Sequence, residues 1–231
     1  MNALKGAILG AALLGMSAAA SAQIWSDNFD SYAAGSQMHG QGGWTGWDNS
    51  PAAGALVSTA QALSAPNSVD INGGSDLVHQ YTGANSGVWT YTANMYIPGN
   101  FTGTTFFIMN NTYNHGGPYD WSIQLQFNSA NPAILDDMRT ENVVNYVRDA
   151  WAEIRVVADL TNDTCDTYYN GTLLSTGTWT TGSGSALNIG AVDLFANGAS
   201  SVFYDNLSLV PEPASLALLA LGAMTLLRRR A

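Results

Sequence analysis

Two glycine-rich loops carry aromatic residues of the kind that bind sugars. Trp44 and Trp47 lie in the segment 40–49, where glycines surround both indole rings, and Tyr113 and Tyr119 belong to a second such loop. A sugar packs its apolar face on an aromatic ring while neighbouring polar groups bind its hydroxyls. We therefore take Trp44, Trp47, Tyr113 and Tyr119 as candidate glycan-binding residues, with local packing of these rings as the alternative.

Three aspartates suggest a structural calcium site. Asp27 and Asp30 flank the first strand-like segment of the chain, and Asp205 lies in the last one. Calcium takes oxygen ligands from carboxylates, carbonyls and amides. If these two segments pair, the three carboxylates approach one another and form a candidate calcium site. The alternative is that each aspartate caps a local turn.

Residues that could perform catalysis are few and scattered. Glycoside hydrolysis needs two carboxylates about 5–10 Å apart, and the only glutamates between residues 23 and 209 are Glu141 and Glu153. Glu153 alternates with Arg155, which favours an exposed ion pair. The lone Cys165 is expected to be a buried, apolar-like residue. We assign no catalytic residue and expect a non-enzymatic protein. The histidines show no metal-ligand spacing: His39, His79 and His115.

The charge of the chain excludes some partners. Residues 23–209 hold three arginines and no lysine, against fourteen aspartates and two glutamates, a net charge of −13. Nucleic acid binding needs a basic surface, so nucleic acid is excluded as a partner. A neutral glycan, a divalent cation or another surface protein suits this acidic body better.

The elements that must position these residues are predicted to be strands. Apolar and polar residues alternate over 89–97, 121–127 and 152–160, which is the pattern of strands with one buried face. Trp121, Ile123, Leu125 and Phe127 are expected to share such a face. Asn170-Gly171 predicts a type I′ hairpin turn. These features predict an all-β domain of two packed antiparallel sheets.

Both ends of the chain look like targeting segments. Lys5, an apolar run and the small residues Ala20 and Ala22 predict a signal peptide over residues 1–22. At the other end, Pro211-Glu212-Pro213 precedes an apolar run without charge, 214–227, that would span ~21 Å as a helix. The three arginines 228–230 follow it and would stay on the cytoplasmic side.

This tail resembles the PEP-CTERM sorting signal of Gram-negative bacteria. The resemblance covers residues 210–231, and its parts are Pro211, Glu212 and Pro213, the short apolar helix, and Arg228, Arg229 and Arg230. It implies processing by an exosortase, transient membrane insertion through the helix, and transfer of the body to the cell surface or extracellular matrix. Proteins with this signal commonly accompany exopolysaccharide production.

The body resembles concanavalin A-like and laminin G-like sandwiches in three places: the segments 27–32, 151–160 and 202–209. The resemblance implies a jelly roll whose first and last strands pair. The sequence departs from enzymes of this fold, because it lacks the Glu-x-Asp-x-x-Glu strand of the glucanases. Gln37 and His39 match the Gln-x-His element of polysaccharide lyases, but without its companion strands.

The sequence thus predicts a signal peptide (1–22), a jelly-roll β-sandwich (23–209) and a sorting signal (210–231). The expected function is that of an exported, non-enzymatic, lectin-like surface protein that binds extracellular polysaccharide. A structural or adhesive protein without sugar specificity is the main alternative, followed by a divergent glycosidase or lyase.

Overall fold

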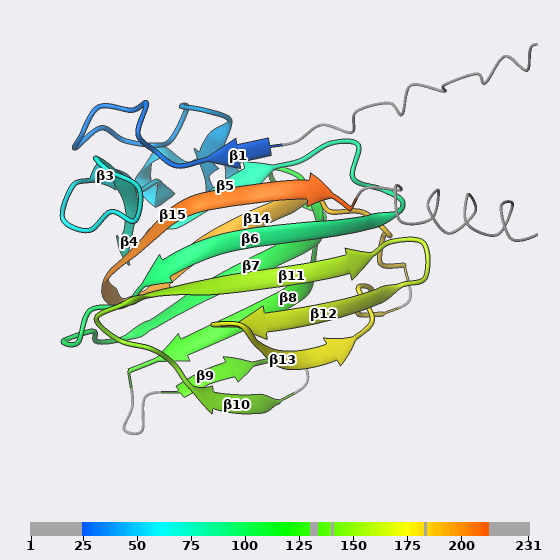
Figure 1. Ribbon diagram of the computed structural model, residues 1–231. Coiled ribbons are helices and arrows are strands. Elements are labelled where there is room, and N and C mark those ends of the chain that lie inside the picture. The colour runs from blue at the N-terminus through cyan, green and yellow to red at the C-terminus, as the bar shows by residue number, and fades with distance from the viewer. Residues whose placement is uncertain (1–24, 130–133, 140, 183, 213–231) are drawn as a thin grey trace, which may run out of the picture.

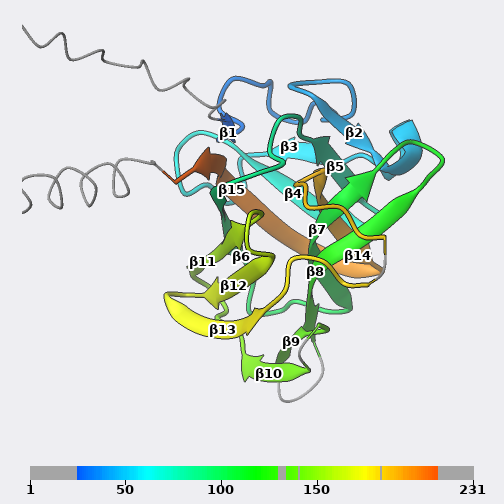
Figure 2. The same cartoon turned by 90° about the vertical axis from the view of Figure 1, so that its right-hand side faces the viewer.

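The computed structural model describes residues 25–129, 134–139, 141–182 and 184–212. These residues form two antiparallel sheets of eight and seven strands that pack face to face (Figure 1; Figure 2 shows the view turned by 90°). The prediction of an all-β, two-sheet antiparallel sandwich is confirmed.

The first sheet runs β13 (Thr172–Gly177), β12 (Thr164–Tyr169), β11 (Trp151–Asp159), β6 (Val88–Tyr96), β15 (Ala199–Pro211), β4 (Ser68–Gly73) and β3 (Leu56–Ser58), with β1 (Trp25–Asp27) also paired to β15. The second runs β10 (Asn142–Asn145), β9 (Ile134–Asp137), β8 (Tyr119–Asn128), β7 (Thr104–Tyr113), β14 (Ala191–Asn197), β5 (Asp76–Gln80) and β2 (Trp44–Gly46). Two 3-10 turns, η1 (Trp47–Asn49) and η2 (Pro51–Ala53), follow β2.

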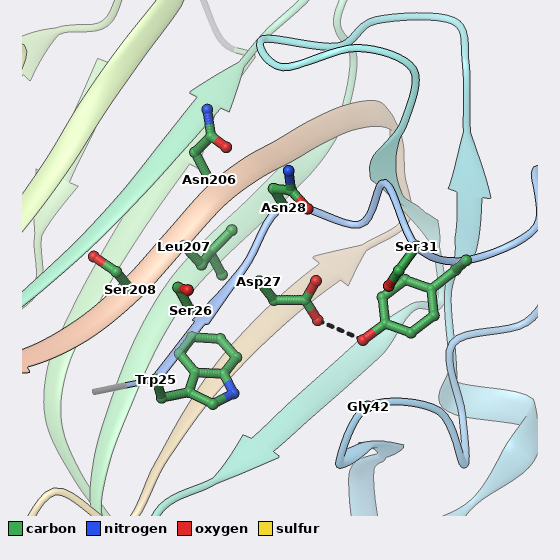
Figure 3. A pocket seen from close by; sticks show the side chains of 10 residues that line it. Trp25, Ser26, Asp27, Asn28, Ser31, Gly42, Asn206, Leu207 and Ser208 are labelled. Atoms are coloured by element: carbon green, nitrogen blue, oxygen red, sulfur yellow. Dashed lines mark hydrogen bonds between the residues drawn. The ribbon is translucent and has the colours of Figure 1, made fainter. Parts of the chain in front are cut away.

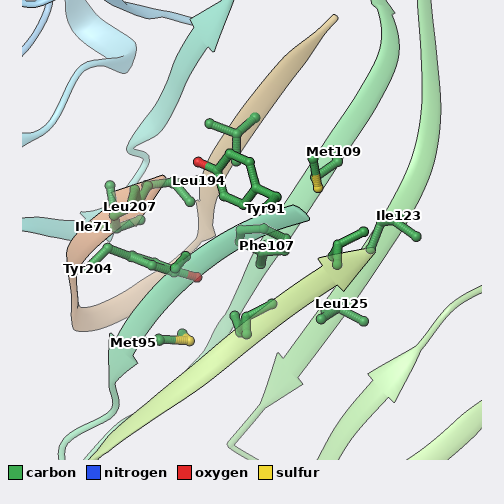
Figure 4. Close-up of a cluster of buried hydrophobic side chains, with 14 of the residues drawn as sticks. Ile71, Tyr91, Met95, Phe107, Met109, Ile123, Leu125, Leu194, Tyr204 and Leu207 are labelled. Carbon is green, nitrogen blue, oxygen red and sulfur yellow. The ribbon is translucent and has the colours of Figure 1, made fainter. Parts of the chain in front are cut away.

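Alternate side chains of both sheets fill the space between them, as the period of a strand requires. The predicted alternation of 89–97 and 152–160 is confirmed, since every second residue of β6 and β11 is buried. Cys165 is also buried, as predicted, and burial raises the pKa of its thiol to about 11. Figure 4 shows part of this core: Ile71, Tyr91, Met95, Tyr204 and Leu207 of the first sheet against Phe107, Met109, Ile123, Leu125 and Leu194 of the second.

One predicted core residue, Trp121, faces outward. Asn110 of β7 lies opposite Trp121 while Met109 lies opposite Ile123, so β8 has Ser122 as an extra residue. Such a β-bulge changes the face on which the following side chains lie. The prediction that Trp121 shares the buried face of Ile123 was therefore wrong, because alternation alone does not reveal a bulge.

The first and last strands pair, as the resemblance implied. Trp25 of β1 lies opposite Leu209 of β15. β15 then continues to Pro211, which lies opposite Trp89 of β6. The sheet therefore includes the first residues of the tail.

The predicted hairpin is present. Tyr169 and Thr172 face each other across Asn170 and Gly171, which have φ angles of 48° and 77°. Positive φ at both positions is the property of a type I′ turn.

The predicted signal peptide with Ala20 and Ala22, and the tail from Pro213 to the arginines 228–230, lie outside the described residues. Among the residues that the structure does describe, no helix has the length and apolar character needed to cross a membrane.

Candidate functional site

A groove lies on the outer face of the seven-stranded sheet. Because Phe107 and Leu194 point into the core, their neighbours in β7 and β14 point to the opposite face. Those neighbours line a hollow of about 330 Å³. Its lining includes Phe106, Ile108, Phe195, Asp76, Asp193, Trp47 and Trp121.

A second hollow continues this groove over β8. It measures about 450 Å³ and shares Trp121, Gln124 and Met138 with the first. Its remaining lining is mostly polar: Asp120, Ser122, Arg139, Thr178, Thr180 and Thr181. The groove therefore combines aromatic rings at one end with hydroxyl, amide and guanidinium groups at the other.

Two tryptophan rings, those of Trp47 and Trp121, line the groove. The half-buried rings of Trp47 and Trp121 are parallel, with 6.3 Å between centroids and 5° between planes. Trp47 also packs on Tyr113 and Tyr119, at 4.8 and 4.7 Å between centroids. The structure thus brings together Trp47, Tyr113 and Tyr119 and adds Trp121, which the sequence placed in the core. Tyr113 is buried, however, and neither tyrosine lines the groove.

Asp48 holds the two aromatic loops together. Its backbone has a φ of 53°, and its amide donates to the Tyr113 hydroxyl at 2.9 Å. Its carboxylate accepts hydrogen bonds from the Tyr119 hydroxyl and from the Gly116 amide, which lower the pKa of Asp48. These bonds fix the ring positions before any ligand arrives, and such preorganisation reduces the entropy lost on binding.

Two aspartates form the polar part of the groove floor. Asp193 is 2% exposed and lies between Val78 of β5 and Ile108 of β7. Burial, repulsion by Asp76 and a hydrogen bond with Asp76 raise the pKa of Asp193 well above its usual range. Burial also raises the pKa of Asp76. Both carboxyl groups therefore hold a proton to a higher pH than an exposed aspartate does, and a proton shared between them removes the repulsion of two neighbouring negative charges.

Trp44 does not belong to the groove, so its prediction as a glycan-binding residue was wrong. Its ring is 0% exposed and packs against Phe29 and His79. The loop is glycine-rich for a packing reason, since a Cβ at Gly42 would lie 1.9 Å from the Tyr32 hydroxyl. Gly42 therefore lets the chain pass close to Tyr32, and the glycine-rich composition does not indicate that Trp44 is exposed.

Asp27 lies at a different hollow, where β1 meets β15. This hollow of about 610 Å³ is polar, and in it the Asp27 carboxylate points toward the Tyr32 hydroxyl (Figure 3). Asp27 accepts hydrogen bonds from that hydroxyl at 2.8 Å, from the Trp44 ring Nε1 at 2.9 Å and from the Phe29 amide at 2.9 Å. The Asp27 carboxylate therefore holds core residues in place through these hydrogen bonds.

Asp30 and Asp205 also bind neighbouring groups of the chain. Asp30 accepts from the Asn67 amide and the Asn28 side chain. Asp205, which is 0% exposed, accepts from the amides of Leu63 and Ser64 at 2.7 and 2.8 Å. No three acidic, histidine or cysteine side chains in the described ranges gather closely enough to hold a metal ion. The structure thus does not bring Asp27, Asp30 and Asp205 together as the expected calcium site.

Asp205 is expected to stabilise the fold through these amide bonds. Asp205→Asn should lower the free energy of unfolding by about 1–2 kcal/mol, because an amide replaces one charged acceptor oxygen with a donor. Urea unfolding in calcium and in a chelator measures this. If calcium stabilised the wild type and Asp205→Asn abolished that stabilisation, the result would instead support a calcium site that includes Asp205.

The carboxylates considered for glycosidase chemistry lie apart. Glu153 is on β11 of the eight-stranded sheet and pairs with Arg155 at 3.5 Å, whereas Glu141 directly precedes β10 of the other sheet. His39 of the Gln-x-His element accepts from the Gly46 amide at 3.1 Å through Nδ1. None of these three side chains lines the groove.

Several solved structures share this fold at low sequence identity. An endo-β-1,4-glucuronan lyase from the fungus Trichoderma reesei has a TM-score of 0.51 at 10% identity, over 81% of this chain and 95% of its own. An alginate lyase, Aly36B, solved with an alginate trisaccharide, has a TM-score of 0.55 at 12% identity, over 82% and 98%. The T. cruzi calreticulin globular domain has a TM-score of 0.53 at 8% identity, over 89% and 94%. Since lyases and calreticulin share it, the likeness shows the fold alone.

Comparison with curated proteins found no match. Residues 209–231 match the model of the PEP-CTERM protein-sorting motif, which is the tail that the sequence singled out. The chain thus carries a PEP-CTERM sorting motif at its C-terminal end, which implies export and processing by an exosortase, and its body has the β-sandwich fold of these solved structures.

Proposed function

We propose that the sandwich is a non-enzymatic glycan-binding module, which holds extracellular polysaccharide in the groove on the outer face of the seven-stranded sheet. The observation that carries this proposal is the pair of parallel, half-buried rings of Trp47 and Trp121 beside the polar lining of the groove. Aromatic rings supply area for the apolar face of a sugar, and the polar side chains supply partners for its hydroxyls.

The charges of the groove favour a neutral glycan. Asp76, Asp193 and Asp120 line it, and Arg139 already donates to the Thr178 carbonyl at 2.9 Å and the Ser175 hydroxyl at 3.1 Å. An acidic polysaccharide would be repelled by the net negative charge of the body, and Arg139 is the one basic residue among the described residues of the groove lining to offset this repulsion. The alginate and glucuronan lyases of similar fold act on acidic chains, so acidic polysaccharides are the informative comparison.

The binding test uses residues 23–212 and columns of neutral polysaccharides, of alginate and of the producing cell's own exopolysaccharide. We expect retention on a neutral polysaccharide. Trp47→Ala and Trp121→Ala should each weaken it about tenfold or more, as for an aromatic residue at the centre of a binding surface.

Trp151→Ala is the matched control. Trp151 is also half-buried and packs on Tyr96, but it lies on the outer face of the other sheet. Its replacement should leave retention unchanged. If no polysaccharide is retained, or if all three variants lose retention equally, the glycan-binding proposal fails and a structural or adhesive role replaces it.

A further inference from the structure

The end of β15 holds part of the sorting motif in the sheet. Val210 lies opposite Thr90, and Pro211 lies opposite Trp89. The Glu212 amide then donates to the Val88 carbonyl at 2.8 Å. The motif match begins at residue 209, so the ladder between β15 and β6 includes its first residues.

The side chain of Glu212 is held as well. The hydroxyl of Thr90 donates to Oε1 of Glu212 at 2.6 Å. Glu212 is the acidic residue of the Pro-Glu-Pro sequence, and both its amide and its carboxylate therefore have partners on β6. An enzyme that reads this sequence has to replace those partners with its own.

We propose that Thr90 restrains exosortase processing by holding Glu212, and that residues 210–212 must detach from β6 before the enzyme can bind them. The terminal rungs of a sheet open at a small fraction of the global unfolding free energy. This contact therefore sets the rate of processing without blocking it. Only chains in which residues 210–212 have detached from β6 can bind the enzyme. Because these chains are a small fraction of the total, the apparent affinity of the enzyme is reduced by that fraction.

The test compares two threonine variants of the full chain. Thr90→Val keeps the β-branched shape and removes the hydroxyl that binds Glu212. Thr92→Val is the matched control, because Thr92 lies two residues along β6 and its hydroxyl bonds to that of Ser208, which precedes the motif, at 2.7 Å. In cells that make the exosortase, pulse-chase labelling follows the conversion of the full-length chain to its shortened form.

We expect Thr90→Val to speed conversion about two- to fivefold, the effect of losing one exposed hydrogen bond. Thr92→Val should convert at the wild-type rate. If Thr90→Val also converts at that rate, the proposal is overturned. If both variants accelerate equally, general loosening of β6 explains the effect, and Thr90 has no particular role.

Hydrogen exchange gives a second readout that does not depend on the enzyme. It uses the full chain, solubilised from cells that lack the exosortase. The Glu212 amide should be protected in the wild type and in Thr92→Val, and less protected in Thr90→Val, while core amides stay unchanged. An unprotected Glu212 amide in the wild type would contradict the proposal, whatever the fate of the groove's glycan binding.

Discussion

Trp44→Ala is expected to lower the free energy of unfolding by about 3–5 kcal/mol, the usual cost of removing a large buried aromatic side chain. The ring is 0% exposed and is surrounded by Trp25, Phe29 and His79, with centroids 5.9, 5.7 and 5.2 Å away. Its removal would leave a cavity between β2, β5 and the first loop. Urea unfolding followed by tryptophan fluorescence measures the loss.

Trp44→Phe separates the hydrogen bond of Trp44 from its volume. Phenylalanine keeps much of the ring but cannot donate to Asp27, to which the Trp44 Nε1 donates at 2.9 Å. We expect this variant to fall between the wild type and Trp44→Ala. Trp47→Ala should cost less stability than Trp44→Ala, because Trp47 is half-buried. If Trp44→Ala were as stable as Trp47→Ala, the buried position of Trp44 would be wrong.

The different burial of Trp44 and Trp47 could not be predicted from the sequence pattern. Trp44 and Trp47 are three residues apart in one glycine-rich segment, and composition treats them alike. The structure separates them, because β2 pairs Trp44 with His79 of β5 and η1 turns Trp47 outward. A short strand and a single 3-10 turn leave too weak a pattern in the sequence to distinguish the two.

The fold was more predictable than the site. Strands such as β6 and β11 carry a long alternation, and Asn170-Gly171 carries a known backbone preference. The groove depends on a bulge at Ser122 and on strands distant in sequence, β5 and β14, which place Asp76 beside Asp193. Neither feature has a local signal, so Trp121 and both aspartates were missed.

Asp193→Asn is expected to stabilise the sandwich at neutral and alkaline pH. Asparagine keeps the shape of the aspartic acid and can still donate a hydrogen bond to Asp76. It removes an ionisable group that has no basic partner and whose Oδ1 has no hydrogen-bond partner among the described residues. At pH 8 the folded wild type must either keep this proton or bury a negative charge beside Asp76, and both cost free energy, so we expect a gain of about 2–4 kcal/mol at that pH.

The direction of the pH dependence follows from the raised pKa of Asp193. Because burial raises that pKa in the folded state above the ordinary value of 3.8, the folded protein binds this proton more tightly than the unfolded chain does. The resulting stability is fully present below pH 3.8 and is lost as the pH rises through the folded-state pKa. Asp76, whose pKa burial also raises, contributes with the same sign.

The difference between wild type and Asp193→Asn isolates this group from the other carboxylates of the chain. Urea unfolding at a series of pH values from 4 to 9 should show the two proteins closest in stability at the acidic end and increasingly different toward the alkaline end. Asp159→Asn is the control, because that carboxylate is exposed on the other sheet and hydrogen bonds, led by the one from the Asn162 side chain, lower its pKa. Its replacement should destabilise the protein, and the effect should disappear toward acidic pH. A pH-independent difference for Asp193→Asn would mean that Asp193 is not buried as a proton-sharing acid, and the polar floor assigned to the groove would have to be revised.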